Sequence, residues 1–170
     1  MPQGMSTVDI NRILFATDFS DCSNGALEAA SRLASGTGAR LFIVHIDGLL
    51  EVSIPSVPAG ADDQYDAPWG YERREVRERL ENVVPTVANV AYEHCYLKGF
   101  PVAELLKCAD SKHVDMIVMG SHGRSGISRL IMGSVAEGVM RRANCPVLIV
   151  KSPSIAANDL SNAIATAAQH

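Results

Sequence analysis

The sequence lacks an excess of positive charge. Its 170 residues include 15 lysines and arginines against 19 aspartates and glutamates, which gives a formal net charge of −4. A dedicated nucleic-acid binder usually presents a basic face, so the composition argues against a protein that binds DNA or RNA. Hydrophobic residues make up 47% of the chain, enough for one domain whose core needs no disulfide or metal.

The chain also lacks the features of an exported or membrane-spanning protein. No apolar run approaches the roughly 20 residues that cross a bilayer, and the opening MPQGMSTVDINR has no apolar segment of a signal peptide. Cysteines are few and form neither a CxxC pair nor a zinc-finger spacing with histidine. We interpret them as reduced thiols packed as small hydrophobes, and expect a cytoplasmic protein with no membrane partner. They are Cys22, Cys95, Cys108 and Cys145.

Short apolar runs alternate with segments of helical periodicity. Such runs are typical of strands buried on both faces of a parallel sheet. We therefore expect an α/β fold, a single doubly wound five-stranded parallel sheet in the order 3-2-1-4-5 with helices on both faces, as in Rossmann-like domains. Residues 1–9 and 152–170 are predicted to be flexible ends of a domain at 10–151. The predicted strands are 12–17, 41–46, 90–97, 114–119 and 146–150.

Apolar residues at helical spacing predict the buried side of each helix. Gly36 and Gly38 are expected to end the first helix. In the helix predicted at 69–84, alternating Arg and Glu indicate either a phosphate or nucleic-acid patch or a solvated face with i,i+4 pairs, and the alternating signs favour the solvated face. Residues 47–68 read as a long surface loop. The predicted inward stripes are Val76, Leu80, Val83 and Val84, and, after Ser134, Ala136, Val139, Met140 and Ala143.

A glycine-rich segment from Gly120 to Ser134 follows the fourth strand and precedes the last helix. Glycines let backbone N–H groups approach a ligand closely, and the N-terminus of a helix favours phosphate. The segment thus combines two anion-binding features, backbone N–H groups at glycines and a helix N-terminus, which together indicate a polyphosphate ligand. The segment is no Walker A loop, because no lysine lies between Lys112 and Lys151.

This segment resembles the nucleotide motif G-x2-G-x9-G-[ST] of ATP-binding universal stress proteins. Gly120, Gly123, Gly133 and Ser134 match the motif without a gap. The flanking runs DMIVMGSHGR, GSVAE and CPVLIV, and the opening ILFATDFS, are also similar to runs of that family. The resemblance covers roughly residues 10 to 151.

The resemblance implies a binding site for ATP, ADP or AMP at three strand ends. Asp18 would meet the adenosine part, with Ala16 and Thr17 beside it, and the backbone of Ile46 would bond adenine. The glycine loop would hold the ribose and phosphates, and Mg²⁺ would accompany the phosphates with Ser134 as a candidate ligand. The predicted loop residues are Met119, Gly120, His122, Gly123, Arg124, Gly133, Ser134 and Val135.

Several of these residues have a simpler structural interpretation. Asp18 could instead cap the first helix or its turn. Ser134 and Glu137 have the spacing of a capping box, which is compatible with phosphate binding. His122 could be a loop histidine, and Arg124 could face solvent rather than offset phosphate charge.

Three functions remain open at this point. We favour a nucleotide-binding stress or signalling protein over an enzyme, because the loop contains no carboxylate that could position a nucleophile. A dimeric protein of the same fold that binds no nucleotide is the second hypothesis. The third is a slow ATPase or an adenylating enzyme of the PP-loop class, whose SGGxDS-like loop has no counterpart in residues 16–21. The apolar last strand, Val147–Val150, is an exposed edge; with the resemblance, it predicts a homodimer.

Overall fold

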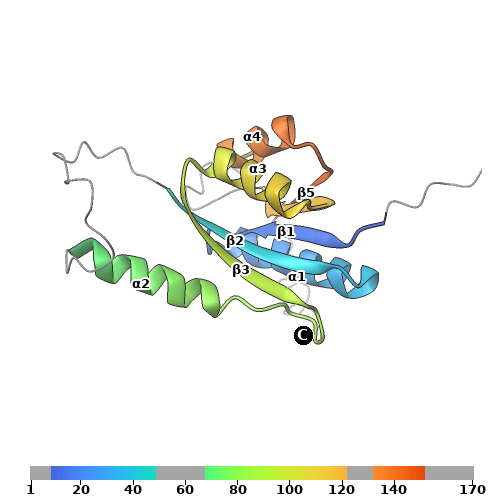
Figure 1. The fold of residues 1–170 in the computed structure, drawn as a ribbon, viewed down its shortest axis with the longest axis horizontal. Helices are drawn as coiled ribbons and strands as arrows, with labels where there is room; N and C mark the ends of the chain where they lie inside the picture. The colour runs from blue at the N-terminus through green and yellow to red at the C-terminus, as the bar shows by residue number, and fades with distance from the viewer. Residues whose placement is uncertain (1–8, 49–67, 122–131, 152–170) are drawn as a thin grey trace, which may run out of the picture.

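The computed structural model describes residues 9–48, 68–121 and 132–151. Within these ranges five parallel strands form one sheet in the order β3-β2-β1-β4-β5 (Figure 1), which confirms the predicted fold. Parallel neighbours cannot be joined by a tight hairpin turn, so a helix lies between consecutive strands in the chain. The strands are β1 (Arg12–Ala16), β2 (Arg40–Gly48), β3 (Tyr92–Gly99), β4 (Met116–Gly120) and β5 (Val147–Val150).

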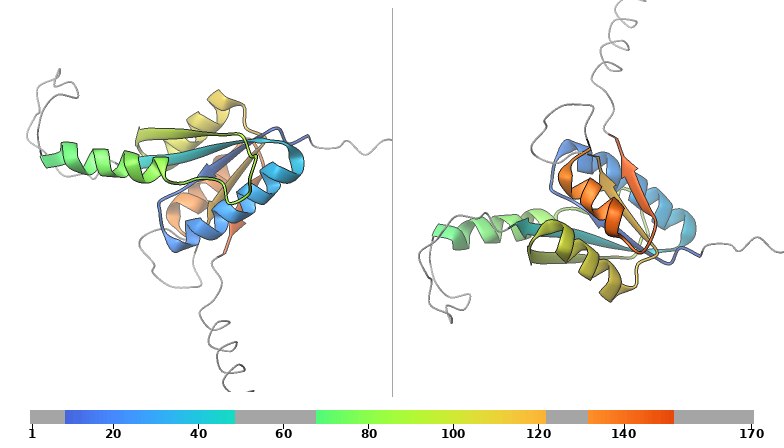
Figure 2. Two further views of the ribbon diagram at one scale, coloured as in Figure 1. Left: turned by 90° about the horizontal axis from the view of Figure 1, so that it is seen from below. Right: turned by 90° about the horizontal axis from the view of Figure 1, so that it is seen from above.

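Helices cover both faces of the sheet. α1 (Asp21–Thr37) lies on the face opposite α3 (Pro101–Lys112) and α4 (Ser134–Arg142), as the two views of Figure 2 show. α2 (Pro68–Glu81) precedes β3 and extends past the sheet. None of the helices in the described ranges has the length and apolar character needed to cross a bilayer.

The inner residues of β1, β2 and β4 are mostly apolar because both faces of these central strands are buried. Adjacent residues of β1 point to opposite faces, so Leu14 packs toward α3 and α4 whereas Phe15 packs toward α1. Leu14 is fully buried and Phe15 is 1% exposed. Each face has its own apolar core, and the central strands belong to both.

The first helix begins and ends at specific caps. The Ser20 side chain accepts a hydrogen bond from the Ser23 amide, and Gly38 ends the helix in the left-handed region with φ 75°. The expectation that Gly36 also ends the helix was wrong, since Gly36 lies inside α1. Only Gly38 has the positive φ that favours glycine at this position.

Two residues of the predicted inward stripes are exposed in the structure. Val84 is 48% exposed and lies beyond the end of α2 at Glu81, so it does not extend the apolar stripe. Met140 is 46% exposed, whereas Ala136 and Val139 of the same helix are buried. α4 therefore buries a narrower face than predicted.

The predicted capping box at the start of α4 is not formed. Gly133 is the N-cap, with no side-chain capping bond, and Ser134 is already helical. Glu137 is therefore at the fourth helical position, one position too late for a capping box, and its carboxylate lies 2.9 Å from Arg141 in an ion pair.

The other boundary predictions differ from the structure by a few residues. β3 begins two residues later than expected, at Tyr92, because its pairing starts where Leu41 of β2 finds a partner. Most of the predicted loop at 47–68 lies outside the described residues, as do residues 1–8 of the predicted N-terminal end and the predicted tail at 152–170.

Candidate functional site

The candidate site lies where β1 and β4 end side by side. Ala16, the last residue of β1, is in register with Met119 of β4. β1 connects onward to β2 on its other side, so the strand order reverses between β1 and β4. Ligands of doubly wound sheets bind beyond the carboxyl ends of the strands at such a reversal.

The turn after β1 is held by its own polar side chains. The Thr17 amide donates to the carbonyl of Val44 at 2.9 Å, and the Thr17 hydroxyl accepts from the Phe19 amide at 3.0 Å. Oδ1 of Asp18 accepts from the amide of Ser20 at 3.1 Å and from its hydroxyl at 2.6 Å. Asp18 thus supports the turn, whereas Ser20 caps the helix.

The end of β4 packs tightly against the first turn of α1. A Cβ at Gly120 would lie 3.1 Å from Sγ of Cys22 and 3.2 Å from its carbonyl carbon and oxygen. Packing therefore favours glycine at this position, because a larger residue would require Cys22 to shift, in addition to any role in a ligand site. The next residue, Ser121, donates its amide to the Val150 carbonyl at 2.9 Å.

One hydrogen bond joins the two ends of the glycine-rich segment. The amide of Gly133 donates to the carbonyl of Ser121 at 2.8 Å. It brings the start of α4 to the end of β4. The first amides of a helix have no partners within that helix, so the amides of Ser134 and Val135 belong to the helix terminus at this end of the sheet. Ser134 is exposed and Val135 is half-buried.

The sequence suggested that Ile46 ends the second strand, but in the structure it does not. β2 continues to Gly48, and because Ala16 pairs with Val44, Ile46 extends beyond β1. Backbone groups two residues apart in a strand point the same way. The Val44 carbonyl faces β1, so the backbone of Ile46 also points to that side, above the turn that follows β1.

Three of the predicted residues lie outside the described part of the chain. They are His122, Gly123 and Arg124, so their proximity to the phosphates of a ligand stays a prediction. The remaining members of the predicted set fall on two adjacent strand ends, the extension of β2 and the start of α4. Among the described residues, no group of three His, Cys, Asp or Glu side chains is arranged to hold a metal ion.

Sequence reasoning missed the histidine behind this turn. His45 is 6% exposed, and its Nδ1 lies 2.8 Å from the Thr17 carbonyl. Its ring lies 4.3 Å from that of Phe19, whose φ is 63°. Arg79 of α2 stacks on the Phe19 ring, with its guanidinium carbon 4.7 Å from the ring centroid. A histidine in an otherwise apolar strand was the available signal, and its role is to support the turn.

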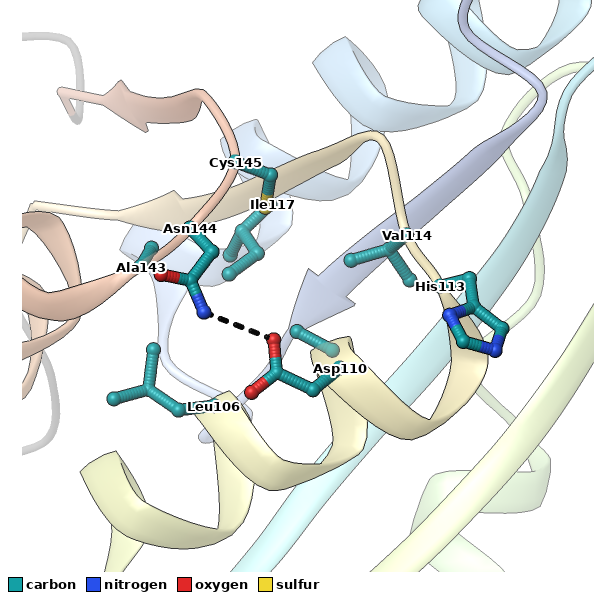
Figure 3. Close-up of a pocket in the computed structure, with 9 residues that line it drawn as sticks. Leu106, Asp110, His113, Val114, Ile117, Ala143, Asn144 and Cys145 are labelled. Carbon is teal, nitrogen blue, oxygen red and sulfur yellow. Dashed lines mark hydrogen bonds between the residues drawn. The ribbon is translucent and has the colours of Figure 1, made fainter.

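A separate cavity of about 300 Å³ lies at the opposite end of the sheet (Figure 3). It opens between the end of α3 and the connection from α4 to β5, where Nδ2 of Asn144 donates to Oδ1 of Asp110 at 3.3 Å. Val114 precedes β4 and Cys145 precedes β5, so this cavity lies at the amino ends of the strands. It shares no residue with the candidate site.

Comparison with known proteins finds the same architecture. Residues 9–151 match the universal stress protein family. The chain is 37% identical over 146 residues to the universal stress protein YxiE of Bacillus subtilis, which covers 83% of this chain and 99% of that protein.

Solved structures also share the fold. The structure of protein MJ0577 of Methanocaldococcus jannaschii superposes with a TM-score of 0.65 at 24% identity, covering 86% of this chain and 99% of that one. A universal stress protein in complex with cAMP superposes with a TM-score of 0.52 at 28% identity, covering 84% of this chain and 97% of that one.

Proposed function

This chain belongs to the universal stress protein family, and we propose that it binds an adenine nucleotide, ATP in the first place, as a nucleotide-dependent module of a stress response. The nucleotide would lie across the carboxyl ends of β1, β2 and β4. The similarity to a universal stress protein in complex with cAMP supports an adenine nucleotide as the ligand class. A cytoplasmic location, where thiols stay reduced, is part of the same proposal.

The hydrogen bond between the Gly133 amide and the Ser121 carbonyl is the observation that carries the proposal. It brings the first amides of α4 to the end of β4, and β4 is in register with β1, which ends just before Asp18. Phosphates would bind at these amides because the helix terminus carries partial positive charge. Adenosine would lie over the turn, with its adenine against the backbone of Ile46. Mg²⁺ would be carried by the phosphates, with the Ser134 hydroxyl as a candidate ligand.

A calorimetric titration tests this function. We expect the purified protein to bind ATP with Mg²⁺, and Gly133→Asp to weaken binding by about 100-fold, or ~2.7 kcal/mol. The reason is that the new carboxylate would occupy the helix terminus at which phosphate binds. Gly36→Asp is the matched control, since Gly36 lies in the last turn of α1, where an added Cβ meets no atom within 4 Å.

The same samples separate the alternatives. Equal affinity of Gly133→Asp and wild type would contradict the proposed site, and no binding by the wild type would favour a dimeric protein without nucleotide. Release of phosphate from bound ATP would favour a slow ATPase. Titrations with ADP, AMP and cAMP identify which phosphates contribute to affinity.

We also propose that β5 pairs with a second copy of the chain. β5 is an edge strand, and the carbonyls of Pro146 and Val150 accept hydrogen bonds from the β4 side. The backbone groups of Val147 and Ile149 therefore point to the open edge. Unpaired edges of this kind are templates for pairing with another strand.

The homodimer is tested at an exposed side chain of this strand. Leu148 is 37% exposed, and pairing through β5 would bury it beside the partner. We expect Leu148→Asp to raise the dimer dissociation constant tenfold or more, because a carboxylate resists desolvation. Val84→Asp is the control at a similarly exposed position, 48%, outside the sheet. Light scattering over a dilution series measures both, and an unchanged dimer in Leu148→Asp would contradict pairing through β5.

A further inference from the structure

Phe19, in the turn after β1, has a backbone conformation that bulky residues rarely adopt. Its φ is 63°, in the left-handed region that favours glycine. A residue stays in such a conformation only where the groups around it hold it there. Phe19 directly follows Asp18, so the groups that hold Phe19 also determine the shape of the turn over which we place adenosine.

Arg79 of α2 contacts both the backbone and the side chain of Phe19. Its Nη2 donates a hydrogen bond to the Phe19 carbonyl at 3.2 Å, and its guanidinium carbon lies 4.7 Å from the centroid of the Phe19 ring. The face of an aromatic ring attracts a guanidinium group. One side chain thus makes two contacts with a single residue that is 60 positions away in the sequence.

Phe19 is in turn bonded to the residues of the candidate site. Its amide donates to the Thr17 hydroxyl at 3.0 Å, and Asp18 lies between these two residues. The Thr17 carbonyl lies 2.8 Å from Nδ1 of His45, whose ring lies 4.3 Å from the Phe19 ring. The turn therefore forms one connected unit with β2, and Arg79 joins this unit to α2.

A second arginine of α2 contacts the end of β2 through Tyr96. The guanidinium carbon of Arg77 lies 4.7 Å from the centroid of the Tyr96 ring, and the Tyr96 hydroxyl donates to Oδ2 of Asp47 at 2.6 Å. Asp47 follows Ile46, whose backbone we propose as the adenine contact. Leu80, which is 2% exposed, anchors the same part of α2 in the core. α2 is thus connected to two segments of the proposed adenosine site.

We propose that Arg79 is a positioning residue of the nucleotide site, through which α2 and the bound nucleotide stabilise each other. While its contacts are made, the turn keeps the shape that adenosine binds. When they break, Phe19 relaxes toward an ordinary backbone conformation and the turn changes shape. The effect is reciprocal, so a nucleotide on the turn stabilises the docked α2 by the same factor by which α2 raises nucleotide affinity. This inference rests on the proposed function, because it concerns the same site.

Calorimetric titrations with adenosine and with ATP and Mg²⁺ test the inference. We expect Arg79→Ala to weaken the binding of both ligands by about tenfold, because adenosine is the part that lies over the turn. Arg74→Ala is the matched control, since it removes the same charge from an exposed position of the same helix, and it should leave both affinities unchanged. A loss for ATP with none for uncharged adenosine would indicate a direct contact between Arg79 and phosphate, and would overturn the positioning role.

Two further variants distinguish positioning from a general loss of stability. Arg79→Lys should recover part of the affinity, because an ammonium group also donates to a carbonyl and binds an aromatic face. Phe19→Gly adopts a positive φ without strain, so the site should no longer depend on Arg79. Adding Arg79→Ala to Phe19→Gly should then change the affinity by less than about twofold. A tenfold loss that persists in this background would contradict the inference.

Hydrogen exchange in the absence of nucleotide measures the turn itself. The Phe19 amide is hydrogen bonded to Thr17, and its exchange should accelerate by about tenfold or more in Arg79→Ala but not in Arg74→Ala. Circular dichroism establishes that each variant is folded. A wild type that binds no adenine nucleotide would refute the proposed function and this coupling with it. A wild type that binds, with unchanged affinity in Arg79→Ala, would overturn the coupling alone.

Discussion

Replacement of Gly120 by valine should lower the free energy of unfolding by about 3 kcal/mol. The added Cβ would lie 3.1 Å from Sγ of Cys22 and 3.2 Å from its carbonyl carbon and oxygen. The sulfur can rotate away, but the backbone atoms move only if the first turn of α1 moves. The two methyl groups of valine enlarge the overlap. Urea unfolding without nucleotide measures this effect independently of ligand binding.

Smaller substitutions distinguish the contact with the Cys22 sulfur from the contacts with the Cys22 backbone. Gly36→Ala should stabilise the protein by about 0.5–1 kcal/mol, because alanine favours a helix and an added Cβ meets nothing there. Gly120→Ala should destabilise it instead. Adding Cys22→Ala should recover only part of that loss, since the backbone contacts remain. Stabilisation by Gly120→Ala would show that the end of β4 is not packed against α1 as described.

The parallel sheet could be predicted because burial on both faces leaves a local signature in the sequence. Runs such as residues 13–15 contain no polar side chain, which a sheet with one solvated face would not tolerate. The ends of the strands were harder to predict. β2 extends past Ile46 because β3 pairs with it as far as Gly48, and a pairing partner distant in sequence leaves no mark on the strand itself.

The candidate site was predictable to the extent that it follows from strand ends and glycines. Sequence reasoning indicated that Ala16, Met119 and Gly120 lie together, and the register of β1 with β4 confirms this. Their contact with a nucleotide stays a prediction.

Other features depend on contacts between distant segments and were missed. His45 supports Thr17 from the neighbouring strand. The capping box was wrong because Gly133, with an extended backbone, is the N-cap and Ser134 is already helical.

The adjacent residues Leu14 and Phe15 provide the most stringent test of the two-sided core. Leu14→Ala should lower the free energy of unfolding by about 2–5 kcal/mol and Phe15→Ala by about 3–5 kcal/mol. Both side chains are at most 1% exposed, yet they belong to different clusters on opposite faces of β1. Phe100→Ala is the control, because Phe100 is 64% exposed and should change stability by at most about 0.5 kcal/mol.

The double variant tests whether the two faces of the sheet contribute independently to stability. Leu14 and Phe15 point away from each other and pack against different helices, so their effects should add to within about 0.5 kcal/mol. Because the double variant would lose most of a typical domain's stability, the measurement should be made at low temperature or with a milder pair, such as Leu14→Ala with Phe15→Leu. If only one of the two substitutions lowered the free energy of unfolding, one face of the sheet would be solvated. The candidate site, where β1 and β4 end between two layers of helices, would then lose its structural basis.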